Sequence, residues 1–112
     1  MKIKLLFLLS VLISPNLFAS NAEENYKAYC WQCHGMQGDG MGLNVRDMSV
    51  QPRDHTSKKA MGGRNDEDLF KVIKKGGLAI DKSVLMPPWE GTFSDDEIHE
   101  LVKYLVELCN CR

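Results

Sequence analysis

Two long segments without regular periodicity occupy the middle of this 112-residue chain. Residues 43–63 are mixed in polarity, contain Pro52 and follow neither helical nor strand spacing, so we predict a loop with short helical turns. A second loop follows Gly76 and Gly77 and runs to Thr92. Loops of this length are uncommon in a compact bundle of helices. They are expected where a chain wraps a body that is not protein.

Helical signals stand on either side of these loops. Residues 23–30 begin with acidic side chains, which the dipole favours in the first turn of a helix. Asn65 can cap a second helix, which Gly76 would end. Ser94 and Glu97 form a capping box in front of apolar positions that recur at helical spacing. Because no strand alternation of useful length is present, we predict an all-α fold of short helices and long loops.

The amino-terminal residues predict export. A basic head with two lysines and an apolar run over residues 5–13 are typical of a secretory signal, which we place over residues 1–22. Cleavage is expected after Ala22, with Ala19 as the alternative, and residues 23–112 form one domain. The apolar run is too short to cross a bilayer, so we expect a periplasmic protein without stable membrane insertion.

Removal of the signal leaves 112 − 22 = 90 residues, with 15 acidic and 12 basic side chains and a net charge of −3. Proteins that bind nucleic acid usually carry a basic excess, so this balance argues against a nucleic-acid partner. A chain of this size buries a modest core and often depends on a cross-link, a metal or a cofactor. The four cysteines of an exported chain therefore need an explanation.

The segment Cys30-Trp31-Gln32-Cys33-His34 has the pattern Cys-x-x-Cys-His, which is typical of c-type haem attachment. Two thiols three positions apart lie on one side of a helical turn and can form thioethers to both vinyl groups of one porphyrin. The imidazole of His34 then lies under the ring and can bind the iron as the proximal ligand. A haem would also supply the flat apolar body that the long loops wrap.

Three other interpretations of these two cysteines compete with haem attachment. A redox-active thiol pair usually begins a helix just after a strand, whereas a predicted helix precedes Cys30. A zinc site needs a second pair of ligands, such as another Cys-x-x-Cys, which the sequence lacks. A structural disulfide between Cys30 and Cys33 would close a very small loop and stabilise little. Haem attachment is the interpretation that we favour.

Five motifs follow one another along the exported chain. They are Tyr26-Lys27-Ala28-Tyr29-Cys30-Trp31-Gln32-Cys33-His34-Gly35, Gly38-Asp39-Gly40, Pro52-Arg53-Asp54, Leu85-Met86-Pro87-Pro88-Trp89 and Leu101-Val102-Lys103-Tyr104-Leu105. With them, the chain from about residue 23 to residue 108 resembles a class I c-type cytochrome, the small single-haem kind exported by bacteria. The resemblance implies the cytochrome c fold, wrapped around one covalently bound haem c. It also implies that the first and last helices cross, which would bring Tyr26 near Leu101 and Tyr104.

The resemblance also assigns roles to individual residues. It implies thioethers at Cys30 and Cys33 and places His34 and Met86 on the iron as its two axial ligands. It further implies that the carbonyl of Pro52 accepts a hydrogen bond from the proximal imidazole, which would fix the orientation of that ring.

Met86 is the strongest candidate among the methionines for the distal position. Pro87 and Pro88 follow it, hold it in an extended conformation and make a stiff loop that can present its thioether. Met61, beside two glycines, is the reserve candidate. The other methionines of the exported chain are expected to fill the core: Met36, Met41 and Met48.

Three further residues keep more than one interpretation. We expect His55 to be an ordinary surface histidine, with distal ligation as the less favoured alternative. Cys109 and Cys111 follow the last helix and depart from the family pattern. They could form a local or intermolecular disulfide, which we favour, or a metal site shared with a partner. They could also attach the chain to another subunit or supply a thiolate ligand in place of Met86.

These observations predict an electron carrier rather than an enzyme. Two filled axial positions leave no site for a substrate, and no residue is assigned a catalytic role. Larger redox proteins would act as electron donor and acceptor. Residues 46–82 hold 9 basic and 6 acidic side chains, whereas residues 90–107 hold 1 basic and 6 acidic ones. This asymmetry fits a charge-steered docking face and two ordinary solvated surfaces equally well.

Two other functions fit parts of the sequence. The chain could be the haem-bearing subunit of a permanent redox complex, with Cys109 and Cys111 at the interface. It could also be a gas-binding or catalytic haem protein, in which the distal position is open or held by a thiolate.

Overall fold

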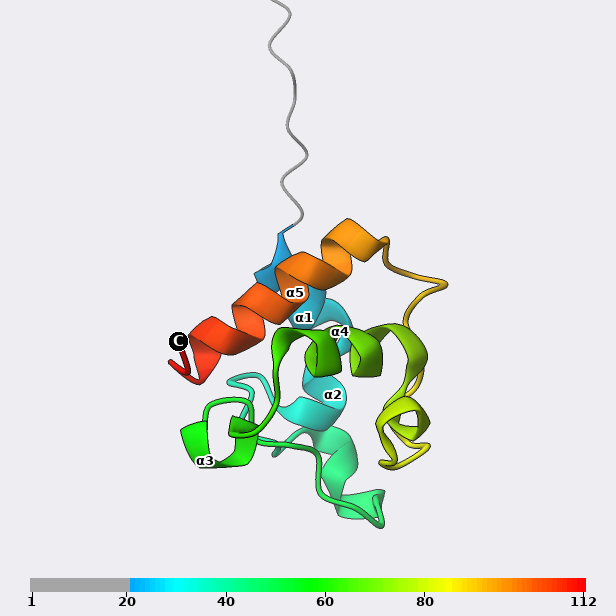
Figure 1. Ribbon diagram of the computed structural model, residues 1–112. Coiled ribbons are helices and arrows are strands. Elements are labelled where there is room, and N and C mark those ends of the chain that lie inside the picture. Colours follow the sequence, from blue (N-terminus) through cyan, green and yellow to red (C-terminus); the bar gives the residue numbers. More distant parts are fainter. Residues whose placement is uncertain (1–20) are drawn as a thin grey trace, which may run out of the picture.

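The computed structural model describes residues 21–112, so the predicted signal lies almost entirely outside the described residues. These residues form short helices joined by long loops, with no strand among them (Figure 1). The α-helices are α1 (Ala22–Tyr29), α2 (Trp31–His34), α3 (Lys58–Met61), α4 (Asp66–Lys75) and α5 (Asp95–Leu108), and the 3₁₀ helices are η1 (Leu43–Asp47) and η2 (Gly77–Ile80). The predicted all-α fold is confirmed. Within residues 21–112, no helix has the length and apolar character needed to cross a membrane.

The two longest helices begin where the sequence predicts. At α4, the Asn65 side chain accepts a hydrogen bond from the N–H of Asp68 at 2.8 Å, and the Asp68 carboxylate accepts one from the N–H of Asn65. At α5, the Glu97 carboxylate accepts from the N–H of Ser94 at 2.8 Å, and the Ser94 hydroxyl accepts from the N–H of Glu97 at 3.2 Å. These reciprocal bonds satisfy N–H groups that a helix leaves unpaired at its start.

The core forms where α1 lies against α5 (Figure 1). Tyr26 of α1 is buried, and the centroid of its ring lies 5.3 Å from that of Tyr104 on α5. The apolar face of α5 is also buried, through Ile98, Leu101, Val102 and Leu105. The expected contact between the first and last helices is confirmed, with Tyr26 at its centre.

Helix α4 packs against α5 and completes the frame. Leu69 and Ile73 of α4 belong to the same buried cluster as the apolar face of α5. Lys74 near the end of α4 forms an ion pair with Asp95 at the start of α5, at 2.7 Å. A surface ion pair of this kind contributes less than about 1 kcal/mol, so apolar packing supplies most of the attachment between the two helices.

The segments predicted as loops carry only short turns. The first contains η1 and α3, and the second contains η2 before it reaches α5. In Figure 1 the first segment lies below α2, on the side away from α5, whereas the second begins at the end of α4 and rises to the start of α5. This arrangement confirms the predicted long loops.

The chain ends in a local disulfide. Cys109 and Cys111 are bonded to each other directly after α5. Of the arrangements that the sequence left open for this pair, the structure has the local disulfide, which leaves Cys30 and Cys33 as the free cysteines of residues 21–112.

Candidate functional site

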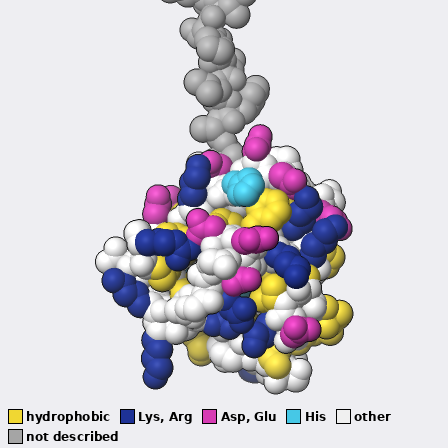
Figure 2. Space-filling view, in the orientation of Figure 1, with side chains coloured by type: hydrophobic (Ala, Val, Ile, Leu, Met, Phe, Trp, Pro, Cys, Tyr) yellow, Lys and Arg dark blue, Asp and Glu magenta, His cyan; other side chains and the backbone are white. Residues whose placement is uncertain are grey.

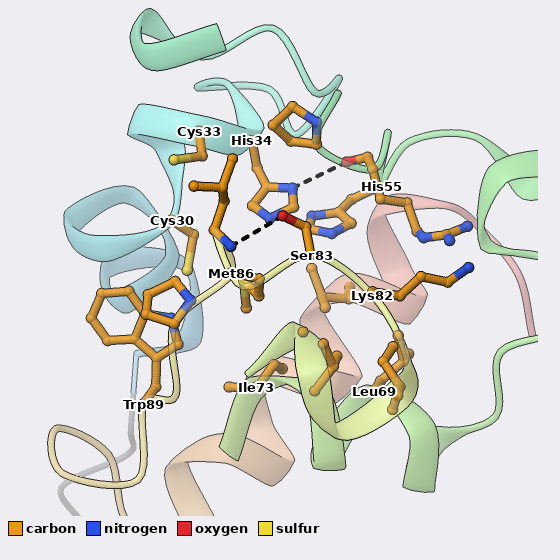
Figure 3. Close-up of a pocket in the computed structure, with 18 of the residues that line it drawn as sticks. Cys30, Cys33, His34, His55, Leu69, Ile73, Lys82, Ser83, Met86 and Trp89 are labelled. Carbon is orange, nitrogen blue, oxygen red and sulfur yellow. Dashed lines mark hydrogen bonds between the residues drawn. The ribbon is translucent and has the colours of Figure 1, made fainter. Parts of the chain in front are cut away.

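Both free cysteines and His34 are carried by a single helical turn. α1 ends at Tyr29, Cys30 forms the junction, and α2 follows immediately. The N–H of His34 donates to the carbonyl of Cys30 at 2.9 Å, which closes this turn around the Cys-x-x-Cys-His motif. The side chains of Cys30, Cys33 and His34 all line one cavity (Figure 3).

This cavity has a volume of about 600 Å³ and is lined mainly by apolar side chains. Leu69 and Ile73 of α4 form part of its wall, together with Leu101 and Leu105 of α5. Sites for cofactors and other small molecules span roughly 300–1,000 Å³ and are mostly apolar. The cavity is therefore suited to a cofactor with a large apolar surface.

Met86 reaches the same cavity from the loop that follows η2 (Figure 3). The N–H of Gly77 donates to the Met86 carbonyl at 2.9 Å, and the N–H of Met86 donates to the carbonyl of Ser83 at 3.3 Å. A Cβ atom at Gly77 would overlap the carbonyl oxygen of Ser83, and one at Gly76 would lie 2.9 Å from that of Met86. The two glycines therefore allow the Met86 loop to pack directly against the end of α4, whereas the sequence predicted only that they end the helix.

The other methionines are not equivalent to Met86. Met61, the reserve candidate, is buried in the core and is not among the residues that line the cavity. Met48 lines the cavity from the end of η1. Met36 and Met41 are 67% and 66% exposed, so the prediction that they fill the core is wrong. They lie in the glycine-rich segment after α2, which runs over the surface.

A backbone carbonyl holds the imidazole of His34, but it is not the carbonyl that we predicted. His34 Nδ1 lies 3.1 Å from the carbonyl oxygen of Arg53 (Figure 3). The Pro52 carbonyl faces Gly40 instead, because a Cβ atom at Gly40 would lie 2.6 Å from its oxygen. The assignment of this hydrogen bond to Pro52 is therefore wrong by one residue, although Pro52 itself does line the cavity.

The surroundings of His34 favour a neutral ring with one free nitrogen. A carbonyl can only accept, so Nδ1 carries the proton that it donates to Arg53. Burial lowers the pKa of His34, which keeps the imidazole neutral at pH 7. Nε2 then holds a lone pair, which is the form of histidine that binds metals.

His55 is neither the surface residue that we predicted nor the distal ligand that we gave as the alternative. It is 8% exposed rather than a surface residue, and its ring stacks on that of His34 with centroids 4.1 Å apart and planes 20° apart. Its Nδ1 lies 2.9 Å from the hydroxyl oxygen of Tyr26. His55 therefore lies beside His34, the residue predicted as proximal ligand, and not opposite it, so the alternative of distal ligation is wrong.

Two arginines lie at the cavity although no sequence pattern predicts them there. Arg53 and Arg64 both line the cavity, and the Arg53 guanidinium donates to the carbonyl of Ala60. Burial, and then the positive charge of Arg64, lower the pKa of Arg53. Neither arginine forms an ion pair with a carboxylate of residues 21–112. Two neighbouring cations at a cavity favour a ligand that brings its own negative charge.

The free thiols bear on whether Cys30 and Cys33 attach a haem, form a redox centre or bind zinc. Burial raises the pKa of Cys30 to about 12, and the neighbouring Cys33 adds to the rise. A thiol with a raised pKa stays protonated at pH 7 and is a poor nucleophile, so Cys30 is poorly suited to be the attacking thiol of a thiol–disulfide redox centre. Zinc has no ligand set either, since no three His, Cys, Asp or Glu side chains of the described chain gather as a metal site. A thioether, which carries no charge, suits the apolar wall.

An all-α fold with a Cys-x-x-Cys-His turn and a methionine at one apolar cavity defines a c-type cytochrome domain. A family model described as "Cytochrome C oxidase, cbb3-type, subunit III" matches residues 18–105, and the chain belongs to this family. No curated protein matches the chain.

Two solved structures have the same fold. One, titled "KustC0563 c-type cytochrome", is 18% identical with a TM-score of 0.61, and the match covers 78% of this chain and 95% of that one. The other, the Kuenenia stuttgartiensis "reducing HAO-like protein complex Kustc0457/Kustc0458", is 28% identical with a TM-score of 0.62. That match covers 78% of this chain but only 40% of the other. The family and the shared fold confirm the predicted resemblance to class I c-type cytochromes.

The cofactor of this class is haem c, an iron porphyrin bound through thioethers, and the site fits it on four counts. Two free thiols are three positions apart, the neighbouring imidazole has an available nitrogen, and the cavity is apolar. The fourth count is the pair of arginines, which could meet the two carboxylates of a haem.

Proposed function

We propose that the chain carries one electron at a time between larger redox proteins. In this proposal Cys30 and Cys33 would hold the haem, and His34 and Met86 would bind its iron. The observation that carries the proposal is that all four side chains line one apolar cavity. Haem supplies an iron centre that accepts and releases a single electron without a change of ligands.

The chain's own residues would hold both ligands in place and so keep substrates away from the iron. The Arg53 carbonyl accepts the Nδ1 proton of His34, which leaves Nε2 free and would let it bind the iron. The backbone bonds between Gly77, Ser83 and Met86 hold the thioether loop in place. With His34 and Met86 both bound to the iron, no ligand position would remain for a substrate, and the proposal includes no catalytic residue.

Transfer between partners needs a weak and rapid encounter rather than a permanent interface. Acidic and basic side chains are interspersed on the face in Figure 2, with more of the acidic ones in its upper part and basic ones on its lower left. The basic segment over residues 46–82 includes Lys82, which lines the cavity. Such a charge distribution supports docking that is steered by charge, with partners that present acidic surfaces.

We propose export to the periplasm, with residues 1–22 as a signal. Asn21 and Ala22 lie at the start of α1, and the Asn21 side chain accepts a hydrogen bond from the N–H of Glu24 at 3.2 Å. Cleavage after Ala22 would remove this cap, whereas the alternative cut after Ala19 would keep it. The intact mass of the exported chain distinguishes the two.

A visible spectrum of the purified protein tests the proposal. A ferric protein with methionine on the iron should show the weak long-wavelength band of that bond, and the ferrous protein should not bind carbon monoxide. Ready binding of carbon monoxide would instead favour a gas-binding or catalytic haem protein. A thiolate in place of Met86 is not supported, since Cys109 and Cys111 are bonded to each other and do not line the cavity.

Membership of a permanent complex is the second candidate function. The family is described as an oxidase subunit, and one similar structure is titled as a complex. The match covers only 40% of the chain from that complex. Size-exclusion chromatography of the native periplasmic extract separates the two possibilities. A haem-bearing peak at the size of the monomer supports a carrier, and elution only in a larger assembly supports a subunit.

A further inference from the structure

The proximal histidine has an aromatic neighbour on one of its faces. The rings of His34 and His55 are nearly parallel, with planes 20° apart and centroids at 4.1 Å. Both residues line the cavity, and Figure 3 shows the two rings side by side. A flat ring in van der Waals contact with another limits the rotation of both.

The His55 ring is itself fixed from two directions. The backbone N–H of His55 donates to the carbonyl of Gly38 at 2.6 Å, and the Nδ1 of its ring is hydrogen-bonded to the Tyr26 hydroxyl at 2.9 Å. Gly38 has a φ of +81°, and a Cβ atom there would lie 3.1 Å from the Tyr26 hydroxyl and 3.5 Å from the Cβ of His55. A side chain at position 38 would be strained by the positive φ and would crowd the Tyr26 hydroxyl, which favours glycine there.

Tyr26 extends the same support into the core. It is 2% exposed, and its ring is 5.3 Å from that of Tyr104 on α5. A leucine at position 55 could fill the space beside His34, but it would leave the buried Tyr26 hydroxyl without this partner. The choice of histidine therefore satisfies a polar group and presents a flat surface to His34 at the same time.

The hydrogen bond from His34 to Arg53 does not fix the imidazole by itself. A carbonyl accepts over a broad range of directions, so a ring held at one nitrogen can still turn about its bond to Cβ. Contact with a second, immobile ring removes that freedom. We propose that His55 is a positioning residue, which sets the plane of the His34 imidazole and keeps its bond to Arg53 short. This inference rests on the proposed function, in which His34 binds the haem iron.

A consequence for the redox centre follows. A hydrogen bond donated by a ligating imidazole makes the ligand more basic, which favours the oxidised metal. If His55 is removed, the His34 ring should turn more freely and that bond should weaken. The reduction potential should then rise, and the paramagnetically shifted haem methyl signals of the oxidised protein should change their order or spread.

The test uses the full-length holoprotein and four variants. His55→Ala removes the ring, Tyr26→Phe removes only its anchor, and the double variant Tyr26→Phe/His55→Phe keeps two flat rings without polar groups. Val102→Ala is the matched control, because Val102 is buried in the same core but does not line the cavity. Each protein is measured by potentiometry, by proton NMR in the oxidised state and by thermal unfolding.

We expect a higher potential and an altered methyl pattern in His55→Ala, a smaller change in the same direction in Tyr26→Phe, and a return toward wild type in the double variant. Val102→Ala should lower the unfolding temperature only. If His55→Ala and Tyr26→Phe both keep the wild-type potential and methyl pattern, His55 merely packs and the inference is wrong. Should His55→Ala not fold, Tyr26→Phe alone decides. A wild-type spectrum without histidine on the iron would instead overturn the proposed function.

Discussion

The two sides of the cavity are built differently. On the His34 side, the imidazole is bonded to Arg53, stacked on His55 and supported through Tyr26 by the core. On the Met86 side, the loop is held by backbone hydrogen bonds to Gly77 and Ser83, and its tip is open to solvent.

Exposure makes the contrast quantitative. Leu78 and Val84 are 66% and 68% exposed, whereas His55 is 8% exposed. Segments with few buried contacts open at a lower free-energy cost than the core. A haem bound here would therefore be anchored from the His34 side. The Met86 loop is the segment that would open first and release its ligand.

The largest expected effect is the loss of His34. His34→Ala removes the better-held ligand, and even a lost supporting partner of a metal ligand costs about 10–100-fold in affinity. Because haem that His34 does not hold should be attached to Cys30 and Cys33 less efficiently, we expect the amount of haem-bearing protein to fall strongly. Haem staining of a denaturing gel, normalised to total protein, measures the change. Recovery near wild type would show that the His34 side does not anchor the haem.

Replacement of Met86 should have a different result. Met86→Leu conserves volume, so its packing cost should stay below about 1.5 kcal/mol and the holoprotein should still accumulate. The potential should fall, because methionine ligation raises it, and carbon monoxide should bind the ferrous form.

Met48→Leu is the matched control for this change, since Met48 lines the same cavity from another segment. It should leave the spectrum and the potential unchanged. If the two variants exchanged these behaviours, Met48 rather than Met86 would be the ligand.

A smaller effect is expected where the Met86 loop meets the end of α4. A Cβ atom at Gly77 would overlap the carbonyl of Ser83, so Gly77→Ala must displace the loop at a cost of about 1–3 kcal/mol. Gly91 has no atom within 4 Å of such a Cβ, and Gly91→Ala should stay within about 0.5 kcal/mol of wild type. Denaturant unfolding measures both. Equal stability of the two variants would mean that the glycine contact does not hold the loop.

The smallest effect belongs to a change outside both sides. Ser94→Ala removes the cap of α5 and should cost about 1 kcal/mol without altering the potential. Unfolding and potentiometry on the same sample test this. A shifted potential would mean that the potential follows overall stability. The differences between the His34 side and the Met86 side would then not explain it.

Local patterns predicted the parts of the fold that local chemistry determines. The predicted cap at Asn65 and the predicted capping box at Ser94 fix where α4 and α5 begin, and each depends only on residues three apart. The Cys-x-x-Cys-His turn is equally local, so Cys30, Cys33 and His34 could be expected at one site.

Contacts between distant segments were harder to predict. The acceptor of the His34 hydrogen bond depends on which carbonyl of a loop faces the ring, and no spacing encodes that choice between Pro52 and Arg53. His55 was expected at the surface because nothing in its own segment reveals that Tyr26, 29 positions earlier, supplies its partner. The neighbouring arginines at the cavity had no local signal for the same reason.

The central claim is that one haem is joined to this chain through Cys30 and Cys33. Mass spectrometry of the exported protein under denaturing conditions tests it most directly. We predict a single species whose mass exceeds that of the processed polypeptide by one haem, and a proteolytic fragment containing residues 30–34 should carry the whole increment. A mass equal to the bare polypeptide, with any haem released on denaturation, would contradict the account.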